Sequence, residues 1–232
     1  MKEGAQTALD ARAVRAVLKP LPPEAGKEAR GRVLVIGGSA RYPGALLLAC
    51  RAALRSGAGV VTAATSHTLA ERLAGLDPNV TFVHLAEAAP GTVAVAAAAQ
   101  VSATLREKFR AVLIGPGLAH ATGTDDFVAA VLRNARALPT VVDADGLNAL
   151  ARTADWTASL PPKTVLTPHD GEAARLAGRV VPTGSARIAF AERAARDWGA
   201  VVVLKGALTV VTDGRKTYVH DAPNAALGVG GS

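Results

Sequence analysis

The sequence has a single cysteine and few aromatic side chains. Cys50 is the only cysteine among 232 residues, so no disulfide can form within the chain and an oxidising compartment is not indicated. Cys50 lies in an apolar helical pattern, which favours a small buried residue over a catalytic thiol. Aromatic residues make up 3% of the sequence, although half of it is hydrophobic. Valine, leucine and alanine must therefore build the core.

Long apolar runs are also missing. No uninterrupted run reaches the ~18 residues that a transmembrane helix needs, and the first ten residues lack the apolar segment of a signal peptide. These absences predict a soluble, cytoplasmic protein with no membrane partner. The net charge of +7 is compatible with nucleic-acid binding. However, the longest basic cluster, residues 27–32, is short, contains Glu28 and has no interleaved aromatic residue. We therefore expect no nucleic-acid partner, but either an ordinary solvated surface or an anionic nucleotide ligand.

Strand and helix patterns alternate through most of the chain, which predicts an α/β fold with a mostly parallel sheet. We expect strands at 33–36, 60–64, 80–83, 111–114, 140–142, 164–166 and 201–204. We expect helices at 7–19, 44–55, 66–74, 124–136, 170–177 and 185–198. An antiparallel hairpin is expected over 208–212 and 216–220, across Asp213-Gly214, while 92–99 fits either strand or helix. One domain over 31–232 follows an N-terminal helix and linker at 1–30.

Five of the expected strands end in residues that are unusual for a simple turn. They are followed by Gly37-Gly38-Ser39, Gly115-Pro116-Gly117, Asp143-Ala144-Asp145, Thr167-Pro168-His169 and Lys205-Gly206. Because ligands of open α/β sheets bind outside the carboxyl ends of the strands, we expect these loops to converge on one site. The glycine spacing matches neither the dinucleotide fingerprint nor the phosphate-binding P-loop. Each loop alone is also compatible with an ordinary turn.

Acidic and amide side chains follow the strand at 140–142. Asp143, Asp145 and Asn148 could hold a hydrated Mg²⁺ or ligand hydroxyl groups. Alternatively, Asp145 caps the helix that contains Leu147 and Leu150. We expect one of the two aspartates to cap the helix and the other to belong to the site.

The segment from Thr167 to Glu172 is the most informative internal motif. In its structural interpretation, Asp170 caps the next helix and Glu172 lies in the first turn, where carboxylates are favoured. In its functional interpretation, His169 hydrogen-bonds a substrate at the sheet edge and Glu172 orients a metal-bound water near phosphates. We prefer the functional interpretation for His169. Lys205, at another strand end, suits a phosphate partner but is also compatible with a surface lysine.

Together these motifs resemble the ADP/ATP-dependent NAD(P)H-hydrate dehydratases, members of the ribokinase-like group. The matching stretches, in the family's order, are 37–45 (GGSARYPGA), 53–60 (ALRSGAGV), 114–118 (IGPGL), 143–148 (DADGLN), 166–172 (LTPHDGE) and 204–209 (LKGALT). The resemblance implies a ribokinase-like three-layer α/β/α sandwich. It also implies repair of hydrated NADH and NADPH, in which ADP or ATP with Mg²⁺ phosphorylates the ring hydroxyl and phosphate is then eliminated.

The resemblance also implies roles for individual residues. Ala45, Gly117 and His169 match substrate contacts. The adenine nucleotide is expected at Lys205, Gly206, Ala207, Leu208, Thr209 and Gly231. Glu172 matches a position associated with Mg²⁺ and phosphate, with Asp143, Asp145 and Asn148 as further metal or phosphate candidates. Relatives of this kind suggest a homo-oligomer.

The expected general base lies beyond the last matched residues. In the family it is an aspartate in a Gly-Gly-Thr-Gly-Asp loop, and Gly230-Gly231-Ser232 matches only the first three positions. We expect a longer natural chain, because a sheet without its closing helix would expose a large apolar patch. The alternative is a truncated, non-catalytic nucleotide binder. A further alternative is a kinase of the same fold that acts on hydroxymethylpyrimidine or hydroxyethylthiazole.

Overall fold

A ten-stranded, mostly parallel sheet organises the part of the chain that the computed structural model describes, residues 6–18, 20–135 and 138–225. Its strand order is β1-β12-β11-β10-β9-β8-β7-β2-β3-β4. The strands are β1 (Gln6–Ala8), β2 (Arg32–Ile36), β3 (Val60–Ser66), β4 (Val80–Leu85), β7 (Ala111–Ile114), β8 (Thr140–Val142), β9 (Thr164–Leu166), β10 (Val201–Leu204), β11 (Leu208–Thr212) and β12 (Thr217–Asp221). The short strands β5 (Glu87–Ala89) and β6 (Thr92–Val93) form a separate pair.

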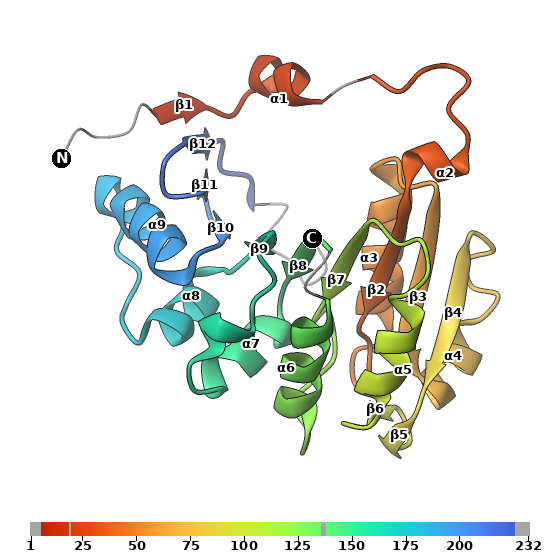
Figure 1. Ribbon diagram of the computed structural model, residues 1–232. Helices are drawn as coiled ribbons and strands as arrows, with labels where there is room; N and C mark the ends of the chain where they lie inside the picture. Colours follow the sequence, from red (N-terminus) through yellow and green to blue (C-terminus); the bar gives the residue numbers. More distant parts are fainter. Residues whose placement is uncertain (1–5, 19, 136–137, 226–232) are drawn as a thin grey trace.

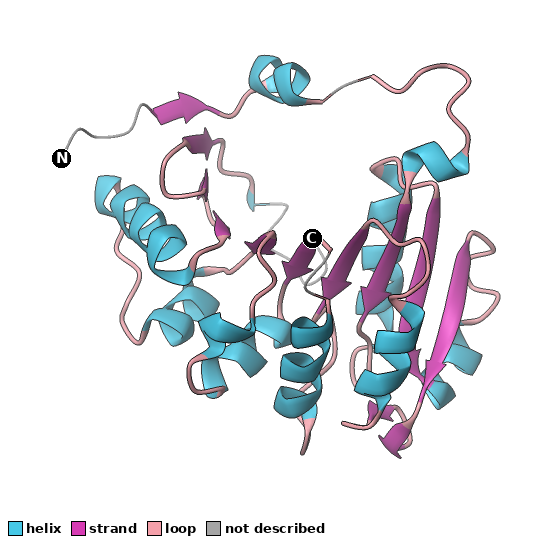
Figure 2. Ribbon diagram, in the orientation of Figure 1, coloured by secondary structure: helices cyan, strands magenta, loops and turns pink. Residues whose placement is uncertain are grey.

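Helices connect most of these strands (Figures 1 and 2). They are α1 (Ala11–Val17), α2 (Lys27–Arg30), α3 (Pro43–Arg55), α4 (His67–Leu73), α5 (Ala97–Thr104), α6 (Thr124–Asn134), α7 (Asp145–Arg152), α8 (Asp170–Ala177) and α9 (Ser185–Trp198), with a 3₁₀ turn at Trp156–Ser159. From β10 to β4 the neighbouring strands β10, β9, β8, β7, β2, β3 and β4 all run parallel. The expected α/β class, the parallel sheet and the C-terminal antiparallel hairpin are confirmed.

One face of the sheet packs against helices α5 to α9 (Figure 1). Strand register places alternate residues of neighbouring strands on this face, and they are fully buried, as at Leu34, Ile114, Val142, Leu166 and Leu204. The apolar runs of the sequence supply these positions, because every second side chain of a strand points to the same face. The larger core is therefore aliphatic, with Phe127 from α6 as its largest fully buried side chain.

The opposite face is covered unevenly. Helices α3 and α4 cover it over β2 and β3, where Leu46, Cys50 and Leu69 pack against Val35 and Val61. Farther along the same face, Val141, Val165, Val201 and Val203 are only partly exposed but belong to neither core cluster. Among the described residues, helices thus cover both faces of the sheet over β2 and β3, but only one face over β8 to β10.

The N-terminal segment differs from the expected helix over 7–19. Residues Gln6–Ala8 form β1, which pairs in parallel with β12 at the sheet edge. Helix α1 begins only at Ala11, because the Asp10 carboxylate accepts a hydrogen bond from the Ala13 amide at 2.8 Å and caps the helix. The ambiguous stretch 92–99 contains both β6 and the start of α5. No helix within the described ranges has the length and apolar character needed to span a membrane.

Candidate functional site

The five unusual loops lie at the carboxyl ends of β2, β7, β8, β9 and β10, which are adjacent and parallel. Backbone hydrogen bonds join them directly. The Gly38 amide donates to the Pro116 carbonyl at 2.8 Å, and the Lys205 amide donates to the Pro168 carbonyl at 2.8 Å. The expected convergence of these loops on one sheet edge is confirmed. This edge is where open parallel sheets place their ligands.

A lysine–aspartate pair spans the end of β9. The Lys205 ammonium lies 2.8 Å from Oδ1 of Asp143, and the Thr167 hydroxyl donates to the same oxygen at 2.8 Å. The side chains of Lys205 and Asp143 are 41% and 30% exposed, so a ligand can reach both. A cation and an anion that remain open to solvent form a pair of modest strength, which a phosphate can displace.

His169 and Glu172 form the N-terminal cap of α8. The Nδ1 atom of His169 accepts hydrogen bonds from the Gly171 and Glu172 amides, and Oε2 of Glu172 accepts one from the His169 amide at 2.9 Å. The structural interpretation of this segment, in which Asp170 caps the helix, was wrong, since His169 is the cap and Asp170 is the first helical residue. The imidazole can cap the helix because its acceptor nitrogen reaches the first backbone amides of α8, which have no partner within the helix and which a carboxylate could also bind.

The cap fixes the chemistry of the His169 ring. With Nδ1 used as an acceptor, the neutral ring carries its proton on Nε2, which lies 3.4 Å from Oε1 of Glu172. The side chain is 55% exposed, so a ligand can reach it although it caps the helix. The structural and functional interpretations of His169 are therefore compatible.

Glu172 is a buried carboxyl that lies close to charged groups of both signs. Burial raises its pKa above the usual value, and the nearby Asp143 carboxylate acts in the same direction. The hydrogen bond from the His169 amide and the charges of Lys205 and His169 act against this increase. Oε2 of Glu172 lies 4.0 Å from the Lys205 ammonium. Asp143, at the end of β8, and Glu172, in the first turn of α8, therefore lie close to the same lysine.

Glycines allow the neighbouring loops to approach one another closely. Gly115 has a φ of 127°, and a Cβ there would lie 1.8 Å from the Asp143 carbonyl oxygen. Gly117 has a φ of 70°, and a Cβ there would lie 2.8 Å from the Ala45 Cβ. Ala45, in the first turn of α3, and Gly117, in the loop after β7, are the two small residues predicted to contact substrate, and they are neighbours. Gly117 itself is buried, and Ala45 is half-buried.

Asp145 and Asn148 are engaged in a different network. Asp145 accepts a hydrogen bond from the Ala119 amide at 2.8 Å and lies within 3.4 Å of the Asn148 amide nitrogen. Oδ1 of the Asn148 side chain in turn accepts a hydrogen bond from Nε of Arg175 at 3.0 Å. The structure does not pair these two residues with Asp143.

The cap of α7 also differs from the expectation. Ala144, at φ 49° and ψ −118°, is the N-cap and makes no side-chain cap bond. The prediction that one of Asp143 and Asp145 caps the helix was wrong, because Asp145 is its first residue and Asp143 faces Lys205. A non-glycine residue in this region of backbone space is strained, and such strain clusters at functional sites.

The loop from Lys205 to Thr209 is closed by its own threonine. The Thr209 hydroxyl donates to the Gly206 carbonyl at 2.9 Å, and the Gly206 amide approaches the same hydroxyl at 3.3 Å. Between them, Ala207 is exposed and Leu208 is half-buried. The side chain of Arg187, from α9, donates hydrogen bonds to the Lys205 and Leu208 carbonyls of this loop. Sequence reasoning missed Arg187, because an arginine in an amphipathic helix is usually a surface residue. Gly231, the remaining nucleotide candidate, lies outside the described residues.

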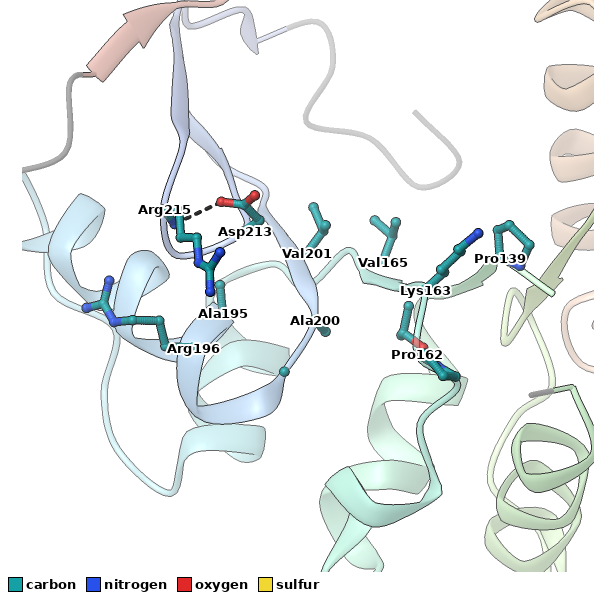
Figure 3. Close-up of a pocket in the computed structure, with 12 residues that line it drawn as sticks. Pro139, Pro162, Lys163, Val165, Ala195, Arg196, Ala200, Val201, Asp213 and Arg215 are labelled. Atoms are coloured by element: carbon teal, nitrogen blue, oxygen red, sulfur yellow. Dashed lines mark hydrogen bonds between the residues drawn. The ribbon is translucent and has the colours of Figure 1, made fainter. Parts of the chain in front are cut away.

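A cavity of about 680 Å³ lies elsewhere, at the opposite ends of β8 to β10 (Figure 3). Its lining includes Lys163, Arg215, Val165 and Val201. The two valines belong to the sheet face that lacks a helical layer among the described residues, which accounts for the hollow. None of the expected site residues lines it, so we place the candidate site at the strand-end loops.

Comparison with known proteins identifies the family of this chain. The family model for NAD(P)H-hydrate dehydratase matches residues 33–232. The chain belongs to this family. The expected family resemblance is confirmed. All of the motifs on which it rests except 53–60 occupy the strand ends described above.

Two relatives illustrate this membership of the NAD(P)H-hydrate dehydratase family. The ADP-dependent (S)-NAD(P)H-hydrate dehydratase of Xanthomonas campestris is 38% identical over 218 residues, covering 92% of this chain and 72% of the relative. The bifunctional NAD(P)H-hydrate repair enzyme of Moorella thermoacetica is 38% identical over 205 residues, covering 87% of this chain and 38% of the relative. The chain thus spans about two fifths of the length of such bifunctional relatives.

Two solved structures agree with this chain in fold. The ADP/ATP-dependent NAD(P)H-hydrate dehydratase of Bacillus subtilis, co-crystallised with ATP and Mg²⁺, has a TM-score of 0.77 and 31% identity, covering 97% of this chain and 76% of that protein. A ribokinase-like protein of Enterococcus faecalis has a TM-score of 0.80 at 23% identity, over 97% of this chain and 75% of that protein. The fold is therefore ribokinase-like.

Proposed function

We propose that the protein catalyses the ADP- or ATP-dependent dehydration of hydrated NADH and NADPH. The hydroxyl oxygen on the damaged ring loses its proton and receives a phosphoryl group from the nucleotide. The carbon–oxygen bond then breaks, phosphate leaves with the bonding electrons, and a neighbouring ring carbon loses a proton. The ring double bond returns, so the reduced dinucleotide is restored.

The observation that carries this proposal is the placement of Lys205 between two carboxylates at the strand ends. Its ammonium contacts Asp143 at 2.8 Å and lies 4.0 Å from Glu172. Phosphoryl transfer depends on positioning and on charge stabilisation more than on covalent chemistry. A phosphate that displaces Asp143 from Lys205 gains a charge-assisted hydrogen bond. The same displacement frees a carboxylate beside the phosphate.

One set of residues binds the hydrated nicotinamide, and another binds the nucleotide. Ala45, Gly117 and His169 receive the hydrated nicotinamide: the two small residues leave room for the ring, and His169 offers an Nε2–H donor to a ring substituent. Lys205 holds phosphate, and the backbone from Gly206 to Thr209, with Gly231, holds the adenine nucleotide. Asp145 and Asn148 act by fixing the loop around Ala119 at the edge of the ring site.

Mg²⁺ is the metal that we propose for this site. Within the described ranges, no group of three or more His, Cys, Asp or Glu side chains is arranged to hold a metal. That suits Mg²⁺, which commonly binds one or two carboxylates together with substrate phosphates and water. Asp143 and Glu172 fit this requirement and would hold the ion. When bound, it would neutralise charge on the phosphates.

The partners follow from this chemistry. The proposed substrates are the small molecules hydrated NADH and hydrated NADPH, with no nucleic acid and no membrane partner. We also propose that the protein works in the cytoplasm as a homo-oligomer.

The test is repair of hydrated NADH, followed by the return of the near-ultraviolet absorbance of the reduced nicotinamide. With ADP or ATP and Mg²⁺, the full-length protein should restore this absorbance, and omission of the nucleotide should abolish the recovery. Failure to restore it, together with phosphorylation of hydroxymethylpyrimidine or hydroxyethylthiazole, would replace the dehydratase function with that of a kinase of the same fold.

A further inference from the structure

Arg187 is a buried cation in the first turn of α9. Its side chain is only 7% exposed. A positive charge is unfavourable at the N-terminus of a helix, and removing it from water has a further cost. The surrounding structure must therefore compensate for its position with specific partners.

Three acceptors from two separate segments of the chain surround the Arg187 guanidinium. Nη1 donates to the Asp170 carboxylate at 2.5 Å, Nη2 donates to the Lys205 carbonyl at 2.7 Å, and Nε donates to the Leu208 carbonyl at 2.9 Å. Asp170 is the first residue of α8, directly after His169. The two carbonyls belong to the loop that follows β10. One side chain therefore joins the two loops that carry His169 and Lys205.

Gly206 provides the space for this contact. A Cβ at Gly206 would lie 2.6 Å from Nη2 of Arg187. The planar guanidinium therefore packs directly under the loop backbone. Lysine has one compact donor group and cannot bind three acceptors that lie around a plane. The contact thus depends on arginine and not only on positive charge.

We propose that Arg187 is a positioning residue for the nucleotide, which it does not touch. It fixes the Lys205 and Leu208 carbonyls, so that the intervening backbone keeps the shape that receives the adenine nucleotide. Its bond to Asp170 holds this loop against the N-terminus of α8, where His169 receives the second substrate. This inference rests on the proposed function for its ligand, although the anchoring of the loop does not depend on any ligand.

The test compares ADP binding to the full-length protein and to three variants by titration calorimetry. Arg187→Lys keeps the charge but loses the planar set of donors, and ADP affinity should fall about tenfold or more, as expected when buried hydrogen bonds to a charged group are lost. Asp170→Asn keeps both carbonyl contacts, so its loss should be smaller. Arg193→Gln is the matched control, because Arg193 lies on the same helix with 67% of its side chain exposed. Its affinity should equal that of the wild type.

Two further measurements distinguish a role of Arg187 in positioning the nucleotide loop from a general loss of structure in the variant. In steady-state assays, Arg187→Lys should raise the KM for ADP while kcat at saturating nucleotide stays near the wild-type value. Amide hydrogen exchange over 205–209 should be faster in Arg187→Lys without any ligand. If Arg187→Lys fails to fold, Gly206→Ala, which displaces the guanidinium, should show the same selective loss of ADP affinity.

The outcomes distinguish this inference from the proposed function. If the wild type binds neither ADP nor ATP, the proposed function fails, and hydrogen exchange over 205–209 then decides the role of Arg187. Unchanged exchange in Arg187→Lys overturns the inference. If the wild type binds ADP and Arg187→Lys binds it equally well, the inference fails and the proposed function stands.

Discussion

The Lys205 ammonium lies 2.8 Å from the Asp143 carboxylate, although 62 residues separate them in the chain. The contact exists because β8 and β10 flank β9 and run in the same direction, so their carboxyl ends meet at one edge. Thr167, from the end of β9, donates to the same oxygen. Three strand ends thus share one polar centre, which a phosphate group can enter by displacing Asp143.

Replacing Lys205 by methionine tests this centre. Lys205→Met should weaken ADP binding about 10- to 100-fold, since a hydrogen bond to a charged group contributes about 1.5–3 kcal/mol. Lys163→Met is the matched control, because Lys163 lies at the opposite end of the strands beside the cavity of Figure 3. Equal ADP affinities for the two variants, measured by calorimetry, would remove Lys205 from the site.

The raised pKa of Glu172 predicts a pH-dependent stability. A carboxyl with a higher pKa in the folded state binds more protons there than in the unfolded chain. The free energy of unfolding should therefore fall as pH rises from the unfolded value of 4.5 through the raised folded pKa. Glu172→Gln cannot ionise, so its stability relative to the wild type should increase across that window. Urea unfolding at a series of pH values measures this, and a difference that stays constant with pH contradicts it.

Gly115 should tolerate no side chain. A Cβ there would meet the Asp143 carbonyl at 1.8 Å, at a φ of 127°. Gly115→Ala should lower the free energy of unfolding by roughly 3 kcal/mol or more, since strain of about 1–3 kcal/mol adds to overpacking of similar size. Gly57→Ala is the control, because Gly57 has a φ of 103° and nothing within 4 Å of the added carbon. It should lose only the strain energy, and equal losses in chemical denaturation would argue against the steric explanation.

At Ala144, a substitution should increase the free energy of unfolding. Its φ of 49° and ψ of −118° disfavour any side chain, including a methyl group. Ala144→Gly should raise the free energy of unfolding by about 1 kcal/mol, through release of local strain. Ala149→Gly, in the interior of the same helix, should instead lower it by at least about 1 kcal/mol. A loss of stability in both variants would show that the backbone at Ala144 is not strained.

Local patterns in the sequence predict most of the fold. Continuous apolar runs such as Val33 to Ile36 mark the parallel strands, and the glycines that follow them mark the sheet edge where the candidate site lies. The strand β1 could not be predicted in this way, because its three residues owe their conformation to pairing with β12, more than 200 residues later. Local propensity favoured a helix there, and tertiary pairing determined the outcome.

The site was predicted less completely than the fold. Residue types at strand ends indicate Asp143, His169, Glu172 and Lys205, but not which of them pair. The structural interpretation of the α8 cap was wrong because an imidazole nitrogen, and not the Asp170 carboxylate, binds the first amides of the helix. Arg187 gave no signal, since its role depends on two carbonyl groups that only the folded chain brings within reach.

The stoichiometry of phosphate release tests the central claim most directly. With ADP or ATP and hydrated NADH, the full-length protein should release one phosphate for each NADH that it restores, because each ring hydroxyl leaves as phosphate. NADH recovery without phosphate release, or phosphate release without recovery, would contradict phosphorylation and elimination at this site.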